Sequence, residues 1–115
     1  MYEAYSSGDL ASALDYLAPD VRWDFTEAPD GVVYHGRDDV ERFWGMLDQV
    51  WESITIEVVA QEERGDTVVN DVRVLGRGRG SGVEVQQPET HVWQLRAGKL
   101  VDGKAYLDRA KMPAE

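Results

Sequence analysis

His91 is the residue whose type and position best suit chemistry, and it is one of only two histidines in the chain. The period of two in a strand places it on the same face as four apolar residues, Val83, Val85, Trp93 and Leu95. A neutral imidazole on an apolar face can donate or accept a proton near physiological pH. A core histidine that is hydrogen-bonded to the protein would show the same pattern, so both interpretations stay open at this point.

Three other polar residues could belong to a site with His91. Asp24 lies in a short segment that alternates like a strand, Asn70 interrupts an otherwise apolar strand face, and Asp108 lies near the end of the chain. A buried amide needs a hydrogen-bond partner, which a ligand carbonyl or His91 would provide. Carboxylates are mostly exposed, so ordinary solvation is the alternative for Asp24 and Asp108. We take His91 and Asp24 as the catalytic candidates and Asn70 as a ligand-binding candidate.

Large apolar side chains are numerous enough to line a hydrophobic cavity, since the chain has four tryptophans. Flat aromatic rings suit contact with flat apolar ligands. Stripes of such residues at helical or strand spacing also build an ordinary core, and some residues would do both. The candidates for ligand contact are Trp23, Phe25, Phe43, Leu47 and Trp93, with Trp44 beside them.

Other chemistries find no support in the sequence. There is no cysteine, which excludes disulfides and thiolate catalysis. The glycine-rich run at residues 76–82 lacks the Lys-Ser/Thr end of a phosphate-binding loop. The two histidines show no metal-ligand spacing. We therefore expect neither a metal nor a cofactor.

Helices in the first half and strands in the second predict an α+β fold in a single domain spanning residues 1–115. Gly8 and Asp9 suit the end of one helix and the N-cap of the next. A period of two marks the strands, which tight turns join into an antiparallel meander. Helices are predicted within residues 1–7, 10–17 and 38–51, and strands within residues 21–25, 54–61, 68–79, 83–96 and 99–109.

The charge and hydropathy restrict the partners and the location. The net charge of −10 repels phosphate groups, and no cluster of Lys and Arg offsets it. Nucleic acid and anionic membranes are therefore not expected as partners. No apolar run has the roughly 18 residues of a membrane span, and the first residues lack a signal-peptide pattern. We expect a cytoplasmic protein.

Four segments in order resemble the SnoaL-like family of the nuclear transport factor two-like superfamily. They read YSSGDLASALDYLAPDVRWDF, YHGRDDVERFW, GRGRGSGVEV and HVWQLRAGKLVDGKAYLDR, and the resemblance covers essentially the whole chain in order. The resemblance implies a cone-shaped, cystatin-like α+β barrel, in which three N-terminal helices pack in the concave face of a curved antiparallel sheet. It also implies an apolar pocket and a homodimer formed through the sheet. The family includes polyketide cyclases, ketosteroid isomerase-like enzymes and many members without known activity.

The catalytic residues of ketosteroid isomerases do not carry over to this sequence. Their tyrosine would fall near Met1, which is no phenol, their base would fall at Phe25, and their protonated aspartate would fall at His91. We therefore expect a pocket protein that binds a small apolar, carbonyl-bearing ligand. One alternative is an isomerase, cyclase or hydratase with His91 as general acid/base, and another is a non-catalytic dimeric scaffold. The dimer is expected through the outer sheet face, which carries Val69, Leu75, Thr90, Val92 and Gln94.

Overall fold

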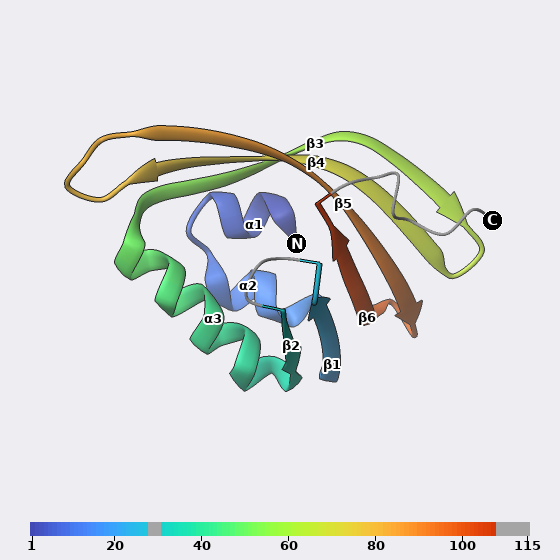
Figure 1. Ribbon diagram of the computed structural model, residues 1–115. Coiled ribbons are helices and arrows are strands. Elements are labelled where there is room, and N and C mark those ends of the chain that lie inside the picture. The colour runs from blue at the N-terminus through green and yellow to red at the C-terminus, as the bar shows by residue number, and fades with distance from the viewer. Residues whose placement is uncertain (28–30, 108–115) are drawn as a thin grey trace.

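A curved six-stranded sheet with three helices on its concave side makes up the α+β fold of the computed structural model (Figure 1). The structure describes residues 1–27 and 31–107, so Asp108 lies outside the described residues. The helices are α1 (Tyr2–Ser6), α2 (Leu10–Asp15) and α3 (Gly36–Val50). The strands are β1 (Leu17–Phe25), β2 (Val32–His35), β3 (Trp51–Arg64), β4 (Thr67–Gly78), β5 (Glu84–Arg96) and β6 (Lys99–Tyr106).

Strands β3 to β6 form the predicted antiparallel meander. Tight turns join them, and each of the three turns holds residues at positive φ: Gly65 at 63°, Gly80 and Gly82 at 86° and 69°, and Ala97 and Gly98 at 52° and 78°. Glycine adopts this conformation at no steric cost, whereas Ala97 is the only described residue other than glycine that does so. Strand β3 extends beyond the predicted residues 54–61 at both ends, whereas β4 and β5 agree with the predicted segments to within one residue at each end.

The expectation of a wholly antiparallel sheet is wrong, because β1 pairs with β6 in parallel. The sheet order is β2-β1-β6-β5-β4-β3, and Trp23 of β1 lies opposite Gly103 of β6. A parallel pair needs a long connection rather than a hairpin. Here α3 and most of the meander lie between the two strands along the chain. Alternation within a strand determines which face each side chain occupies, but it does not determine the direction of the neighbouring strand.

The second helix is shorter than predicted. Leu17 continues the apolar stripe of that helix, yet α2 ends at Asp15 and Leu17 is the first residue of β1. Leu17 pairs with Leu100 of β6 and is fully buried, and the amide of Leu100 donates to the Tyr16 carbonyl over 2.9 Å. Pairing with β6 therefore overrides a helical periodicity that would have extended the helix by two residues, to Leu17.

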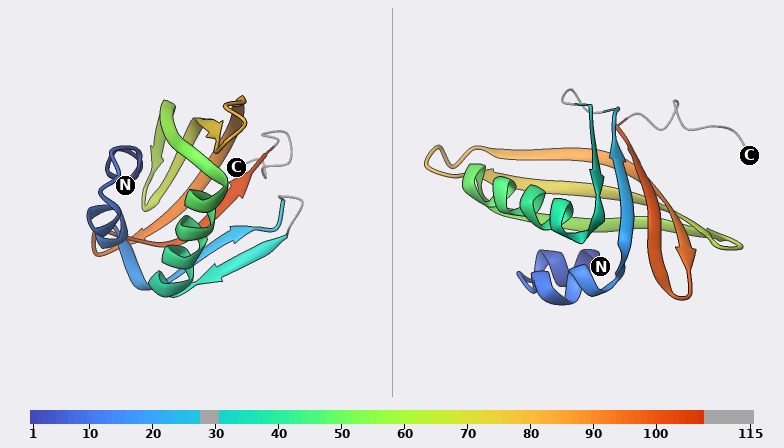
Figure 2. Two further views of the ribbon diagram at one scale, coloured as in Figure 1. Left: turned by 90° about the vertical axis from the view of Figure 1, so that its left-hand side faces the viewer. Right: turned by 90° about the horizontal axis from the view of Figure 1, so that it is seen from below.

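The core lies between α3 and the concave face of the sheet, and two further views show α3 crossing that face (Figure 2). Helix α3 starts after His35, whose backbone amide donates to a carboxylate oxygen of Asp39 over 3.0 Å, and Asp38 and Asp39 lie in its positive first turn. The buried residues of this core are Ala13, Leu17, Val21, Trp23, Val40, Trp44 and Trp93. Within residues 1–27 and 31–107, no helix is long and apolar enough to cross a membrane.

Trp93 and Gly103 pack closely against each other in the middle of the sheet. The ring of Trp93 lies over the glycine so closely that a Cβ there would come within 2.4 Å of ring atom Cζ3. The indole also contacts Trp23, with ring centroids 4.8 Å apart. Gly103 therefore provides the space that holds the Trp93 indole against β6, with its N–H directed at α1.

Candidate functional site

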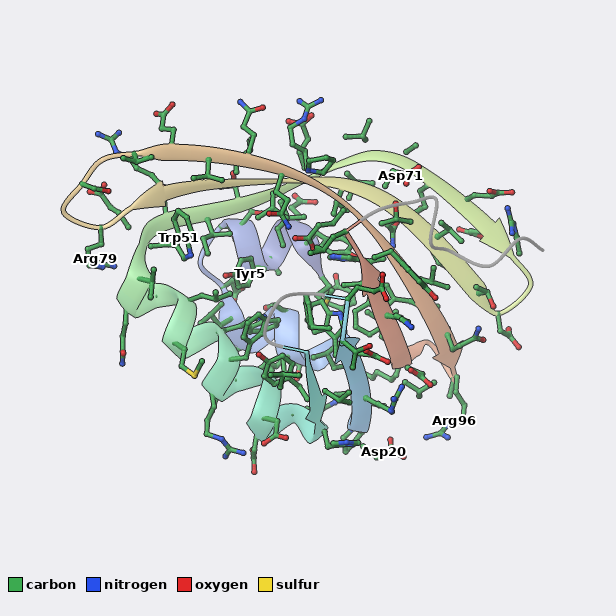
Figure 3. All side chains as sticks on the ribbon, viewed as in Figure 1. Tyr5, Asp20, Trp51, Asp71, Arg79 and Arg96 are labelled. Carbon is green, nitrogen blue, oxygen red and sulfur yellow. The ribbon has the colours of Figure 1, made fainter. Side chains whose placement is uncertain are left out.

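An aromatic cavity of about 180 Å³ lies between α1, α3 and strands β1, β3, β4 and β5. Its wall is mostly apolar, since aliphatic residues of β3, β4 and β5 complete the ring of aromatic side chains. Figure 3 shows Tyr5 and Trp51 on the concave side of the sheet, near the space between the helices and the strands. The aromatic lining residues are Tyr5, Trp23, Phe25, Phe43, Trp44 and Trp51, and the polar ones are Gln87, Glu89 and His91.

His91 lies at the polar end of the cavity with both ring nitrogens hydrogen-bonded. Its Nδ1 is 2.8 Å from the hydroxyl of Tyr2, and its Nε2 is 2.8 Å from Oε1 of Glu89. The indole N–H of Trp93 donates to the same Tyr2 oxygen over 3.0 Å. All donors are satisfied when Trp93 donates to Tyr2, Tyr2 donates to Nδ1, and Nε2–H donates to Glu89. In this arrangement the Nε2–H of His91 orients the carboxylate of Glu89.

Glu89 brings a carboxylate to the cavity wall, which the sequence analysis did not include. Its side chain is 12% exposed, and its second oxygen accepts from Nε2 of Gln87 over 3.1 Å. Gln87, Glu89 and His91 occupy alternate positions of β5 and therefore share its concave face. The same period of two that placed His91 on this face also predicts Gln87 and Glu89 there.

Tyr2 is the other functional residue that sequence reasoning missed. The isomerase tyrosine aligns near Met1, which is no phenol, but the next residue, Tyr2, places a phenol against His91. Burial raises the pKa of the Tyr2 hydroxyl above its usual 10.0, and the nearby Glu89 charge acts in the same direction. Hydrogen bonds from Trp93 and Asn70 oppose this increase. The hydroxyl therefore stays protonated and can donate to His91. Tyr2 does not itself line the cavity.

Asp24, the second catalytic candidate, does not line the cavity. It faces the convex side, because it alternates with Trp23 and Phe25, which point inward. One carboxylate oxygen accepts from the amide and hydroxyl of Thr26, at 2.8 and 2.6 Å. Although partial burial raises the pKa of Asp24, these hydrogen bonds and the charges of Lys104 and Arg22 bring it below its ordinary value. Asp24 is an ionised carboxylate fixed on the opposite face from His91.

The ligand-binding candidates divide into two groups. Trp23, Phe25, Phe43 and Leu47 line the cavity together with His91. Asn70 and Trp93 are buried beside the network but do not line the cavity, and the Asn70 Oδ1 accepts from Gln61 over 2.7 Å. Asn70 lies opposite His91 in the β4–β5 register and on the same face.

The indole nitrogen of Trp23 stands out among the buried polar atoms. Nε1 of Trp23 is the only such side-chain atom within residues 1–27 and 31–107 that lacks a hydrogen-bond partner. The Trp23 ring lies edge-on to the His91 ring, with centroids 5.9 Å apart. An unpaired buried N–H costs free energy until an acceptor reaches it. In the part of the chain that the structure describes, no group of three or more His, Asp, Glu or Cys side chains could hold a metal ion.

The comparisons with known proteins identify relatives of this fold. The model of the SnoaL-like domain family matches residues 1–103. An NTF2-like protein of unknown function from Burkholderia pseudomallei is 28% identical, with a TM-score of 0.81, and the match covers 96% of this chain and 87% of that one. No curated protein matches the sequence.

Two more distant structures share the fold alone. A putative polyketide cyclase from Xanthomonas campestris is 20% identical, with a TM-score of 0.81 over 96% of this chain and 86% of that one. A hypothetical protein with a ketosteroid isomerase-like fold from Catenulispora acidiphila, solved in complex with trimethylamine, is 15% identical, with a TM-score of 0.81 over 91% of this chain and 79% of that one. The curved sheet with three helices is thus the fold of NTF2-like proteins.

Proposed function

We propose that this chain, which belongs to the SnoaL-like domain family, binds a small apolar carbonyl compound in the aromatic cavity. The observation that carries the proposal is the pairing of Glu89 with His91 at one end of an otherwise apolar wall. Ligand pockets of this kind use an apolar lining for affinity and a few polar groups for orientation. The unpaired N–H of Trp23 on the same wall supports a ligand with a hydrogen-bond acceptor, such as a carbonyl oxygen.

Acid/base catalysis is a second candidate function, because a carboxylate lines an apolar cavity. In this reaction Glu89 takes a proton from the carbon next to the ligand carbonyl. The C–H bond breaks, an O–H bond forms on Glu89, and the electron pair moves to the carbonyl oxygen as an enolate. Glu89 then returns the proton to the same or another carbon, so no other reactant is needed. Isomerases, cyclases and hydratases share such a step.

In this proposal His91 has a different role from the one expected of it. Both of its ring nitrogens have protein partners, whereas each carboxylate oxygen of Glu89 accepts one hydrogen bond and keeps capacity to accept another, so Glu89 is the member of the pair that can take a proton, and His91 positions one of its oxygens. Gln87 holds the other oxygen of Glu89 from the adjacent position on the same face. His91 is therefore a positioning residue in this proposal, and Glu89 is the catalytic one. Asp24 has no part in it, because it faces the other side of the sheet.

The binding proposal is tested by native mass spectrometry of the freshly purified protein, followed by calorimetric titration with a panel of small ketones. A bound neutral molecule or saturable binding of a ketone is the expected result. If no ketone binds and the purified protein carries no ligand, the non-catalytic scaffold is the better description.

The catalytic candidate is tested by proton exchange at the carbon next to the carbonyl. Deuterium uptake from heavy water into a bound ketone is followed by NMR for the wild type, Glu89→Gln and Asp24→Asn. We expect uptake in the wild type and in Asp24→Asn, and a loss of about 100-fold or more in Glu89→Gln, which is typical for removal of a catalytic base. Equal rates in Glu89→Gln and the wild type would exclude Glu89 as the base.

A further inference from the structure

A second cavity of about 420 Å³ lies directly beside the aromatic one. It is bounded by α1 and the turn that follows it, by the C-terminal turn of α3 and by the first residues of β3. Its wall is more polar, because the hydroxyls of Ser7, Ser53 and Thr55 and the carboxylate of Glu52 contribute to it. We call the aromatic cavity the inner cavity and this one the outer cavity.

A shared wall separates the two cavities. The five side chains that line both of them are Tyr5, Trp44, Leu47, Trp51 and Ile54. Trp44 is part of the buried core and packs against Tyr5, with ring centroids 5.1 Å apart. Trp51 is half-buried and lies outside that core cluster, at the junction of α3 and β3. Trp51 is therefore the large side chain of the wall that can be changed without removing the core.

The surroundings of Trp51 hold its ring in the wall. Its carbonyl accepts from the guanidinium of Arg79 over 3.2 Å, and the same guanidinium donates to the Asp48 carbonyl over 2.8 Å. The ring lies on Gly76 of β4, where an added Cβ would come 3.0 Å from ring atom Cε3. Gly76 lines the inner cavity, and the three atoms nearest to a Cβ added at this position all belong to the ring of Trp51. The absence of a side chain at position 76 thus leaves room for the ring.

We propose that Trp51 is a specificity-determining residue that closes the inner cavity against the outer one and so limits the length of the ligand. The inference rests on the proposed binding function, because it concerns ligands of the inner cavity. The inner cavity alone is smaller than the roughly 300–1,000 Å³ of most ligand pockets, whereas the two cavities joined come within that range. With Trp51 in place, the ligand is a compact molecule of about one ring. Without it, the ligand is an elongated one that extends to the hydroxyls and carboxylate of the outer cavity.

A homologous series of ketones tests this limit. Calorimetry measures the affinities of phenyl ketones with alkyl chains of increasing length, from acetophenone to octanophenone, for the wild type and Trp51→Ala. Each methylene that becomes buried raises the affinity by about fourfold. We expect the affinity of the wild type to stop rising, or to fall, after the first few methylenes. In Trp51→Ala the increase continues to the longer chains.

A matched control separates the opening of the wall from a general increase in cavity size. Val85→Ala also enlarges the inner cavity, but Val85 does not line the outer one. The affinity of this variant should therefore stop rising at nearly the same alkyl-chain length as the affinity of the wild type. If Trp51→Ala does not fold, Trp51→Leu shortens the same side chain while keeping it apolar. A continued rise in the wild type, or an equal gain in Val85→Ala, would overturn the proposal.

A neutral dye distinguishes failure of this inference from failure of the proposed function. Nile red is too large for the inner cavity alone, and its own fluorescence reports an apolar environment. If no ketone binds any variant, the proposed function fails. Even in that case, dye fluorescence that rises only with Trp51→Ala supports the closing role of Trp51. Equal dye fluorescence with the wild type, Trp51→Ala and Val85→Ala would overturn that role.

Discussion

The hydroxyl of Tyr2 and Nδ1 of His91 lie 2.8 Å apart, although 89 positions separate these residues along the chain. Through this contact α1 is joined to the central strand β5 at the polar end of the inner cavity. The same hydroxyl accepts from Trp93, whose ring is packed on Gly103. One phenol therefore connects the first helix, the catalytic candidate pair and the middle of the sheet.

We expect Tyr2→Phe to lower the free energy of unfolding by about 1–3 kcal/mol at neutral pH. The substitution removes only an oxygen, but it leaves Nδ1 of His91 and Nε1 of Trp93 buried without partners. Urea unfolding followed by circular dichroism gives the value. Tyr16→Phe is the matched control, because Tyr16 is 50% exposed and its substitution should change stability by no more than about 0.5 kcal/mol. Equal stabilities of the two variants would contradict a structural role for the Tyr2 hydroxyl.

Alkaline pH should destabilise the wild type more than Tyr2→Phe. Burial raises the pKa of Tyr2 in the folded protein above 10.0, so the unfolded chain loses this proton first as the pH rises. The stabilisation is fully present below pH 10 and is lost above it, at up to about 1.4 kcal/mol per pH unit for one proton. Urea unfolding between pH 8 and about pH 11 measures the two slopes. The raised pKa of Tyr5 affects both proteins alike. Parallel curves would show that Tyr2 titrates normally.

Two glycine-to-alanine substitutions should have opposite effects on stability. In Gly103→Ala the new methyl group would overlap the Trp93 ring, so we expect a loss of about 2 kcal/mol or more from displaced core packing. In Gly45→Ala nothing lies within 4 Å of the new Cβ, and the position is inside α3, so we expect a gain of about 0.5–1 kcal/mol. Thermal and urea unfolding of both variants provide the comparison. A tolerated Gly103→Ala would mean that Trp93 is not held by that glycine.

We expect a homodimer through the convex face of the sheet. Leu75 and Val92 on this face are only partly buried in the single chain and leave apolar surface for a partner, whereas Val69 and Thr90, each 4% exposed, offer little. Arg73 forms an ion pair with Glu57 of the same chain, so the apolar residues rather than this pair would form the contact. Sedimentation at micromolar concentration should show a dimer for the wild type and a monomer for Leu75→Glu. Val83→Glu, in the turn before β5, should remain dimeric. A monomeric wild type would refute the prediction.

The sequence by itself determined which residues of β5 face the cavity. Alternation follows from the geometry of the backbone, so His91, Glu89 and Gln87 had to share one face wherever the strand was placed. The same local rule put Asp24 on the face opposite Trp23 and Phe25. The apolar stripe of α3 likewise identified Phe43 and Leu47 as residues that face the sheet.

Only the tertiary structure decided which of these residues meet. Leu17 begins a strand rather than ending a helix because it pairs with β6. The hydropathy pattern of β1 or β6 does not reveal that these two strands pair in parallel. The contact of Tyr2 with His91 and the separation of the cavities by Trp51 depend on how α1 and α3 pack against a sheet formed from residues far away. Periodicity is local covalent geometry and can be deduced from neighbouring residues, whereas a hydrogen bond or a cavity wall between distant segments exists only once packing has placed both partners.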